Sequence, residues 1–244
     1  MRNVIVTGGS RGLGLEISRR LSGAGYRAIA VARKMNDELG TVIDEAEHCR
    51  PGSLSFVPFD LGDVEAIPEL VRNLHQDFGA IYGLVNNAAL GSDGALAVMP
   101  NSQIESLIRL NALSPIVLTK YVVRRMMSDG GGRIVNIASI TAFTGYSGLS
   151  VYAATKSSMI GFTRSLAREV GRLGINANAI APGFMDTVMT QGMDEEHRQK
   201  IARRSALRRF PETGDVADAV EFLLGDKSKS ITGTVLTVDA GTTA

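Results

Sequence analysis

Short apolar runs alternate along this chain with longer stretches in which apolar residues recur at helical spacing. The apolar runs are rich in β-branched residues, which is typical of buried strands. They cover residues 3–7, 26–32, 54–59, 81–85, 133–138, 175–181 and 233–239. The clearest helical patterns follow over 15–23, 64–78, 101–127, 152–171 and 215–224. This alternation predicts an α/β fold in a single domain, 1–244, with one doubly wound parallel sheet and helices on both faces.

A glycine-rich turn follows the first expected strand. Gly8, Gly12 and Gly14 fall within seven residues, and a helical pattern begins at once. Strand, glycine turn and helix in this order are the context of a dinucleotide-binding turn, because glycine lets the backbone approach a pyrophosphate at the helix N-terminus. A tight turn without a ligand is the alternative. The close spacing favours the ligand and makes the expected fold Rossmann-type.

The residue after the second expected strand indicates which dinucleotide would bind. An acidic side chain there would bond the adenosine ribose hydroxyls and favour NAD. This chain has Arg33 instead, with no acid until Asp37, and Arg11 lies in the glycine turn. Two cations can clamp a ribose 2′-phosphate by charge-assisted hydrogen bonds. The sequence therefore predicts NADP(H), against the alternative of two solvated surface arginines.

Tyr152 and Lys156 are the candidate reactive pair. Four residues apart on a helix, they share one face. A nearby cation favours the phenolate, so we expect Lys156 to lower the pKa of Tyr152 from ~10. Such a phenol can exchange a proton at neutral pH. Ser139 ends the expected strand 133–138, and its hydroxyl could hold a substrate oxygen beside the phenol. The spacing alone would also fit an ordinary surface Tyr and Lys.

Three polar residues near strand ends or inside a helix have both a structural and a functional reading. Asn is a poor helix former, so Asn111 within 101–127 predicts a widened helix that orders water, or else an exposed neutral position. Asp60 could bond an adenine amino group, or it could cap the next helix, as Asp63 also could. Asn87 could tie neighbouring strands together or line a cofactor pocket.

Residues 184–212 fit the repeating pattern least. They contain Met185, Met189 and Met193, followed by a basic run over 198–209. Methionine adapts to varied apolar shapes, and a long insertion beside the ligand edge suits a substrate lid. A plain pair of surface helices is the alternative.

Composition narrows the choice of partners. The net charge of +1 gives no reason to expect nucleic acid or an anionic membrane, and no apolar run is long enough to span a bilayer. A single cysteine, Cys49, excludes an intrachain disulfide. The three histidines are scattered, so we expect no metal site. No signal peptide precedes the first strand, and we expect a cytoplasmic protein.

Six motifs stand in the order found in short-chain dehydrogenases/reductases, and the chain resembles that family from residue 3 to residue 241. Within the family it is most similar to the 3-oxoacyl-[acyl-carrier-protein] reductases, through residues 161–170, 181–184 and 231–239. The motifs are Thr7-Gly8-x-x-x-Gly12-x-Gly14, Asn86-Asn87-Ala88, Asn111, Ser139, Tyr152-x-x-x-Lys156 and Pro182-Gly183.

The resemblance implies a role for each matched residue. Tyr152 would be the general acid, and Lys156 would lower its pKa and bond the nicotinamide ribose. Ser139 would orient the substrate carbonyl, and Asn111 would hold a water that relays protons. Besides Tyr152 and Lys156, the residues expected to contact NADP(H) are Gly8, Ser10, Arg11, Gly12, Leu13, Gly14, Arg33, Asp60, Leu61, Asn87, Ala88, Pro182, Gly183, Met185 and Thr187.

The sequence departs from the family at two points. Ala89 stands where the family usually has glycine, which we expect to shift packing without abolishing binding. The loop 126–133 is typically basic in reductases that meet an acidic carrier, whereas this one contains serine, aspartate and glycines. Four arginines could still form a basic patch: Arg124, Arg125, Arg168 and Arg172.

The implied activity is NADPH-dependent reduction of a 3-oxoacyl thioester to the 3-hydroxyacyl product. An acyl carrier protein is the candidate partner, and the implied assembly is a homotetramer paired through the two long helices and the last strand. Another small ketone, a sugar or a secondary alcohol is the alternative substrate. A non-catalytic NADP-binding regulator is the alternative outside the enzymes, and the complete Asn–Ser–Tyr–Lys set argues against it.

Overall fold

A computed structural model describes residues 1–91, 93–185, 199–200 and 202–244. Its centre is a parallel sheet with the strand order β3-β2-β1-β4-β5-β6-β7. This confirms the predicted doubly wound α/β fold. The strands are β1 Asn3–Thr7, β2 Arg27–Ala32, β3 Leu54–Pro58, β4 Ile81–Asn86, β5 Gly132–Ile137, β6 Ile175–Pro182 and β7 Val235–Val238.

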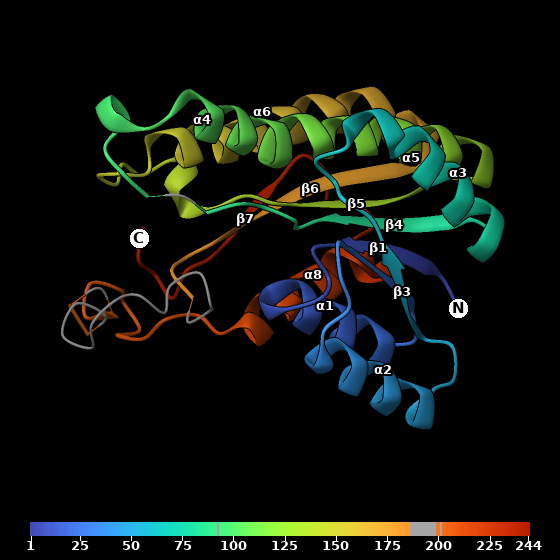
Figure 1. Ribbon diagram of the computed structural model, residues 1–244. Coiled ribbons are helices and arrows are strands. Elements are labelled where there is room, and N and C mark those ends of the chain that lie inside the picture. Colours follow the sequence, from blue (N-terminus) through green and yellow to red (C-terminus); the bar gives the residue numbers. More distant parts are fainter. Residues whose placement is uncertain (92, 186–198, 201) are drawn as a thin grey trace.

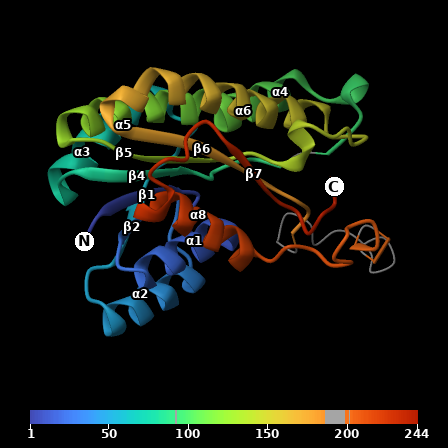
Figure 2. The same ribbon diagram turned by 180° about the vertical axis from the view of Figure 1, so that it is seen from behind.

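Helices cover both faces of the sheet (Figure 1). One layer contains α1 Gly12–Gly23, α2 Asp37–Cys49 and α8 Thr213–Leu224. The other contains α3 Ile67–Phe78, α4 Asn101–Ile108, α5 Ser114–Asp129 and α6 Ser150–Val170. Figure 2 shows the same two layers from behind, with the sheet between them.

Burial on both faces explains why the strands read as unbroken apolar runs. In β1, Val4 and Val6 pack into the core on the α1 and α8 side, whereas Ile5 packs into the core under α3, α5 and α6. All three side chains are fully buried. Because successive strand residues point to opposite faces, a sheet covered on both sides needs an apolar residue at nearly every position.

The chain reverses its direction of winding between β1 and β4. From β1 it builds outward to β2 and β3, then returns to place β4 on the other side of β1. The carboxyl ends of β1 and β4 therefore diverge into loops on opposite helix layers, and ligands of open α/β sheets bind at such a switch point.

The helix expected over 101–127 is interrupted. A wide π turn, Arg109–Leu113, separates α4 from α5, and the Ser114 N–H donates to Arg109 O five residues back. The widening predicted from Asn111 is therefore present.

Residues 186–198 and 201 of the expected lid lie outside the described residues. In the last part of the expected lid, Ala206 N donates to Gly241 O and Leu207 N to Ala240 O, which holds this part against the tail beyond β7. No helix in the described part of the chain could cross a membrane.

Candidate active site

The glycine turn is packed closely against the end of β4. A Cβ added to Gly14 would lie 2.1 Å from Gly8 O and 2.6 Å from Asn87 Nδ2. Gly8 has a φ of +67°, which a side chain would strain. Only glycine fits these two positions, so the backbone of the turn is exposed to whatever binds above it.

The start of α1 is suited to an anion. Its N-cap residue, Arg11, makes no side-chain capping bond, and its first turn contains no acidic residue. The first N–H groups of a helix need partners and carry partial positive charge. A pyrophosphate would supply both the acceptors and the charge, and the open space at Gly12 leaves room for it.

Thr7 and Asn87 fix the turn to the neighbouring strand. Thr7 Oγ1 accepts from Asn87 N at 2.9 Å and from Ala88 N at 3.0 Å. Asn87 Nδ2 in turn donates to Thr7 O at 2.9 Å. The strand-tying role considered for Asn87 is thus present, while its contact with a cofactor stays a prediction.

Arg11 and Arg33 lie at the same edge of the sheet. Arg33 directly follows β2, and Gly8 N donates to Val31 O at 2.8 Å, so the glycine turn adjoins the end of that strand. Both arginine side chains are exposed, and neither makes an ion pair within the part of the chain that is described. Two free guanidinium groups are therefore available to a phosphate.

Asp63, and not Asp60, caps the next helical segment. Asp63 accepts from Ala66 N at the 3-10 turn Val64–Ala66 that precedes α3. Asp60 Oδ1 instead accepts from Gly62 N at 2.9 Å and remains exposed beside the end of β3. Leu61 is buried in the core under α3, so only its backbone could reach a ligand.

The reactive residues gather at the end of β5. Ser139 begins the 3-10 turn Ile140–Ala142, where its Oγ accepts from Thr141 N at 3.2 Å. Lys156 is only 4% exposed, and its Nζ donates to Ile137 O at 2.8 Å. Nζ lies 5.7 Å from the centre of the Tyr152 ring. Phenol, hydroxyl and ammonium thus share one corner, as their sequence spacing suggested.

Burial controls the protonation of this group. It raises the pKa of Tyr152 to about 12, and a hydrogen bond with Ser139 acts in the opposite direction. It lowers the pKa of Lys156 to about 8. The expectation that Lys156 lowers the pKa of Tyr152 is therefore wrong for this structure. The ammonium is directed to the Ile137 carbonyl, and removal of the phenol from water outweighs any attraction.

Asn111 ties α6 to the loop after β4. Its Oδ1 accepts from Leu90 N at 2.8 Å, while its Nδ2 donates to Leu90 O at 2.9 Å and to Thr155 Oγ1 at 3.3 Å. The side chain is 2% exposed. Asn111 thus lies buried in the π turn with all three of these partners satisfied by its amide group.

The end of β6 forms the opposite side of the site. Gly183 N donates to Val238 O at 2.9 Å, and a Cβ on Gly183 would lie 2.8 Å from Asp239 Cα. Pro182 ends the strand, and Met185 packs partly against the core on the α1 and α8 side. Thr187, expected to contact the cofactor, lies outside the described residues.

Comparison with known proteins agrees with this arrangement. A family model described as short chain dehydrogenase matches residues 2–198. The chain belongs to the short-chain dehydrogenase/reductase family. Such enzymes are oxidoreductases that bind a nicotinamide cofactor, and the glycine turn and the Ser139, Tyr152 and Lys156 corner are the parts of this family member that suit those tasks.

Two curated relatives are 3-oxoacyl-[acyl-carrier-protein] reductases. The human one is 38% identical over 97% of this chain and 95% of its own length. The one from Escherichia coli K12 is 35% identical over 97% and 95%. A solved short-chain dehydrogenase from Burkholderia cenocepacia, in complex with NADP, is 32% identical, with a TM-score of 0.92 over 100% of this chain and 98% of the other.

A buried polar network that was not predicted from the sequence lies under the candidate site, between the sheet and the helices that cover it. Asn86 Nδ2 donates to Asn136 Oδ1 at 2.8 Å and to Thr119 Oγ1 at 2.9 Å, and Asn136 Nδ2 donates to Thr163 Oγ1 at 2.8 Å. The network joins β4 and β5 to α5 and α6. An asparagine inside the apolar run 133–138 was the signal that could have revealed it.

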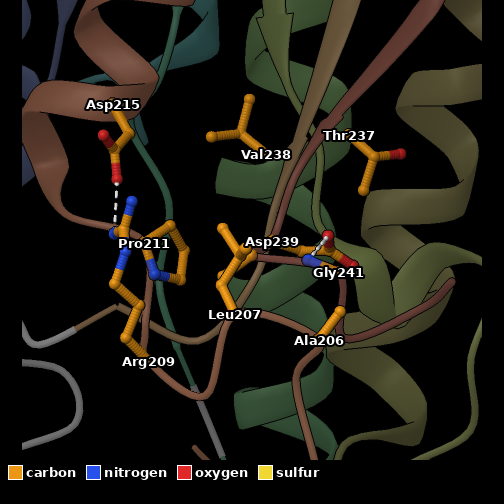
Figure 3. Close-up of a pocket in the computed structure, with 10 residues that line it drawn as sticks. Ala206, Leu207, Arg209, Pro211, Asp215, Thr237, Val238, Asp239 and Gly241 are labelled. Atoms are coloured by element: carbon orange, nitrogen blue, oxygen red, sulfur yellow. Dashed lines mark hydrogen bonds and ion pairs between the residues drawn. The ribbon is translucent and has the colours of Figure 1, made fainter.

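A cavity of about 430 Å³ opens between residues 206–211, in the last part of the expected lid, and β7 with the tail beyond it (Figure 3). Arg209 and Asp215 form an ion pair at one end, 3.1 Å apart. Ser139, Tyr152 and Lys156 do not line it. This cavity is therefore separate from the candidate site formed by those three residues. No group of three or more metal-binding side chains occurs among the described residues.

Proposed function

We propose that this short-chain dehydrogenase/reductase is an NADPH-dependent carbonyl reductase that converts a 3-oxoacyl thioester to the 3-hydroxyacyl product. The observation that carries the proposal is a Tyr152 phenol kept protonated by burial, in one corner with Ser139 and Lys156. A protonated phenol is the form that a reduction consumes.

The residues of this chain would divide the work as follows. Ser139 and Tyr152 donate hydrogen bonds to the carbonyl oxygen and polarise it. The glycine turn and the end of β6 would hold a reduced nicotinamide cofactor, whose chemistry would be hydride donation to the carbonyl carbon. As negative charge develops on the oxygen, Tyr152 gives it the phenolic proton, because an alkoxide is a stronger base than a phenolate. The Lys156 ammonium then stabilises the phenolate that is left.

The cofactor proposal rests on Arg11 and Arg33. Both are exposed at the glycine-turn edge of the sheet, and no acid occupies the position after β2. The relative from Burkholderia cenocepacia was solved with NADP. We propose that the two guanidinium groups hold the 2′-phosphate, and that Asp60, Leu61, Asn87 and Ala88 border the adenosine.

The substrate proposal rests on the reductase relatives, and one observation favours a second candidate. Asp129, in the loop that is basic in carrier-dependent reductases, lies 3.2 Å from His75 Nε2 and accepts from Ile81 N at 3.4 Å. This carboxylate is built into the fold and would repel an acidic carrier. A ketone substrate that needs no carrier is therefore the second candidate.

We also propose a homotetramer. Apolar side chains are exposed on the outer surface of the α4–α5 layer at Ile108, Leu113 and Ile116, and Phe222 is exposed on α8. Exposed apolar patches on separate surfaces suit two different subunit contacts. Light scattering on the purified protein would detect four chains, or would contradict this.

Turnover assays separate the two substrates. NADPH absorbance is followed with acetoacetyl groups on acyl carrier protein, on coenzyme A and as a simple ester. We expect reduction of the thioesters with NADPH. Turnover of the simple ester alone would favour the second candidate, and no NADPH oxidation with any carbonyl compound would contradict the proposed function.

A further inference from the structure

Two aromatic rings meet between the loop before α6 and the segment after β6. Tyr146 lies on the loop between the 3-10 turn Ile140–Ala142 and α6, and Phe184 directly follows Gly183 at the end of β6. Their ring centres are 5.7 Å apart and their planes cross at 71°, an edge-to-face contact. Such pairs are stabilising beyond the area that they bury. The contact joins the segment with Ser139 and Tyr152 to the segment after β6.

The loop that positions Tyr146 is held on both sides. Before it, Thr144 donates to Ile140 O through its N–H at 3.0 Å and its hydroxyl at 2.8 Å. After it, Leu149 N donates to Tyr146 O at 3.2 Å, and Gly94 N donates to Gly148 O at 3.0 Å. The loop is therefore tied to the start of α6 and to the loop after β4. These bonds fix the backbone that carries the Tyr146 ring.

Phe184 is equally constrained. Its neighbour Gly183 is bonded to Val238 O and approaches Asp239 so closely that a Cβ would collide. The backbone before Phe184 is thus held against the end of β7, and the ring is placed where it contacts Tyr146. Both partners are partly buried, which leaves part of each ring free to contact a ligand.

The reacting carbonyl must lie between the same two segments. Its oxygen has to reach Tyr152 and Ser139 on one side, and the proposed function places the nicotinamide against Pro182, Gly183 and Met185 on the other. The geometry points to Tyr146 and Phe184 as an aromatic wall that selects substrates by the size of the group next to the carbonyl carbon. The inference rests on the proposed function and deepens it. A methyl or linear group fits beside the wall, whereas a flat or branched group has to separate the rings.

Two β-keto esters that differ only in this group test the wall. Ethyl acetoacetate has a methyl group beside the ketone, and ethyl benzoylacetate has a phenyl group. Wild type, Tyr146→Ala and Tyr146→Phe are compared by kcat/KM with NADPH. In Tyr146→Ala the ratio of kcat/KM for the phenyl ester to that for the methyl ester should rise about tenfold. A phenyl group would then no longer have to break one edge-to-face contact and displace a ring. Tyr146→Phe keeps the ring and should retain the wild-type ratio.

A second variant tests the pairing itself. Phe184→Ala should raise the ratio like Tyr146→Ala, and the double variant should raise it little further, because the two rings act as one unit. Equal losses for both esters, or an unchanged ratio in Tyr146→Ala, would overturn the inference. Full additivity in the double variant would overturn the pairing.

Binding without turnover distinguishes this failure from failure of the proposed function. With NADP⁺ no reduction can occur, and calorimetry then gives the affinity of each ester for the complex. The same shift in the phenyl-to-methyl affinity ratio is expected in Tyr146→Ala. Absence of turnover in wild type with these esters and with the acetoacetyl thioesters contradicts the proposed function, whereas an unshifted affinity ratio contradicts the wall.

Discussion

Lys156 Nζ lies 5.7 Å from the centre of the Tyr152 ring but donates its hydrogen bond to Ile137 O. The two side chains share a helix face and yet have different partners. Burial moves their pKa values apart, to about 12 for the phenol and about 8 for the ammonium. At neutral pH both groups carry their protons, the state from which a carbonyl can be reduced.

Removal of the phenolic hydroxyl should stop turnover without loss of the cofactor. For Tyr152→Phe we expect kcat to fall by about 10²–10⁴-fold, the range for a positioned general acid. NADPH binding, measured by nucleotide fluorescence, should stay close to wild type. Tyr121→Phe on α5 is the matched control and should be fully active. Wild-type turnover rates in Tyr152→Phe would show that Tyr152 is not the general acid.

The buried ammonium should make stability depend on alkaline pH. The pKa of Lys156 is lowered from 10.5 to about 8 in the folded protein, so between these values the unfolded chain binds a proton that the folded chain lacks. Stability then rises with pH across this window. Relative to Lys156→Met, wild type should gain roughly 2–3 kcal/mol between pH 7 and 10.

Urea unfolding of both proteins at several pH values measures this difference. Tyr152 also titrates abnormally, but it is present in both chains and cancels. A difference in unfolding free energy that stays constant with pH would mean that burial does not lower the pKa of Lys156.

Charge reversal at Arg33 should change cofactor choice. Arg33→Asp removes a proposed phosphate contact and supplies an acceptor for ribose hydroxyls. The ratio of kcat/KM for NADPH over NADH should fall by about 10–100-fold, since hydrogen bonds to charged groups contribute about 1.5–3 kcal/mol. Lys34→Asp makes the same charge change at the next exposed residue and should have a much smaller effect. Equal ratios in Arg33→Asp and wild type would refute the cofactor assignment.

Loss of the Asn111 side chain should loosen the loop after β4. Asn111→Ala leaves the N–H and carbonyl of Leu90 without their protein partner. We expect a loss of about 2–4 kcal/mol in unfolding free energy, from two unmatched backbone groups, together with reduced kcat. Asn101→Ala, at an exposed position at the start of α4, should be close to neutral. Similar losses in both variants would show that the tie is unimportant.

A single methyl group should disrupt the glycine turn. Gly14→Ala would place a Cβ 2.1 Å from Gly8 O, so the turn must open, and both stability and NADPH affinity should fall sharply. Gly23→Ala lies in the same helix with no atom within 4 Å of the new Cβ. It should stabilise the protein by about 0.5–1 kcal/mol. Nucleotide titration and thermal melting compare the two, and unimpaired NADPH binding by Gly14→Ala would refute the role of the turn.

The sheet could be predicted from sequence because both of its faces are buried. All seven apolar runs form strands, with ends within two residues of those expected. The low helix propensity of Asn111 correctly indicated that the helix is widened there. Arg33, Asp60 and Ser139 were also correctly expected just past the ends of β2, β3 and β5, because parallel strands bring their carboxyl ends to one edge of the sheet.

Properties that depend on solvent exposure could not be predicted. The spacing of Tyr152 and Lys156 fixed their common face but gave no indication of how deeply the phenol lies, so the direction of its pKa shift was wrong. Likewise, Asp60 and Asp63 had equal standing in the sequence as helix caps, and only the path of the backbone after β3 decided which one caps the helix. The meeting of Tyr146 and Phe184 joins residues 38 positions apart, which no local pattern reveals.

The wide turn at Arg109–Leu113 also limits how this chain can change in length. The turn contains one residue more than a regular helical turn, so deletion of one residue here would restore a regular helix with α4 and α5 still in phase. Asn111 would then lose the wide turn that places its side chain beside Leu90. Changes in length should therefore be tolerated far better at Arg50 and Pro51, which are exposed between α2 and β3, than in this turn.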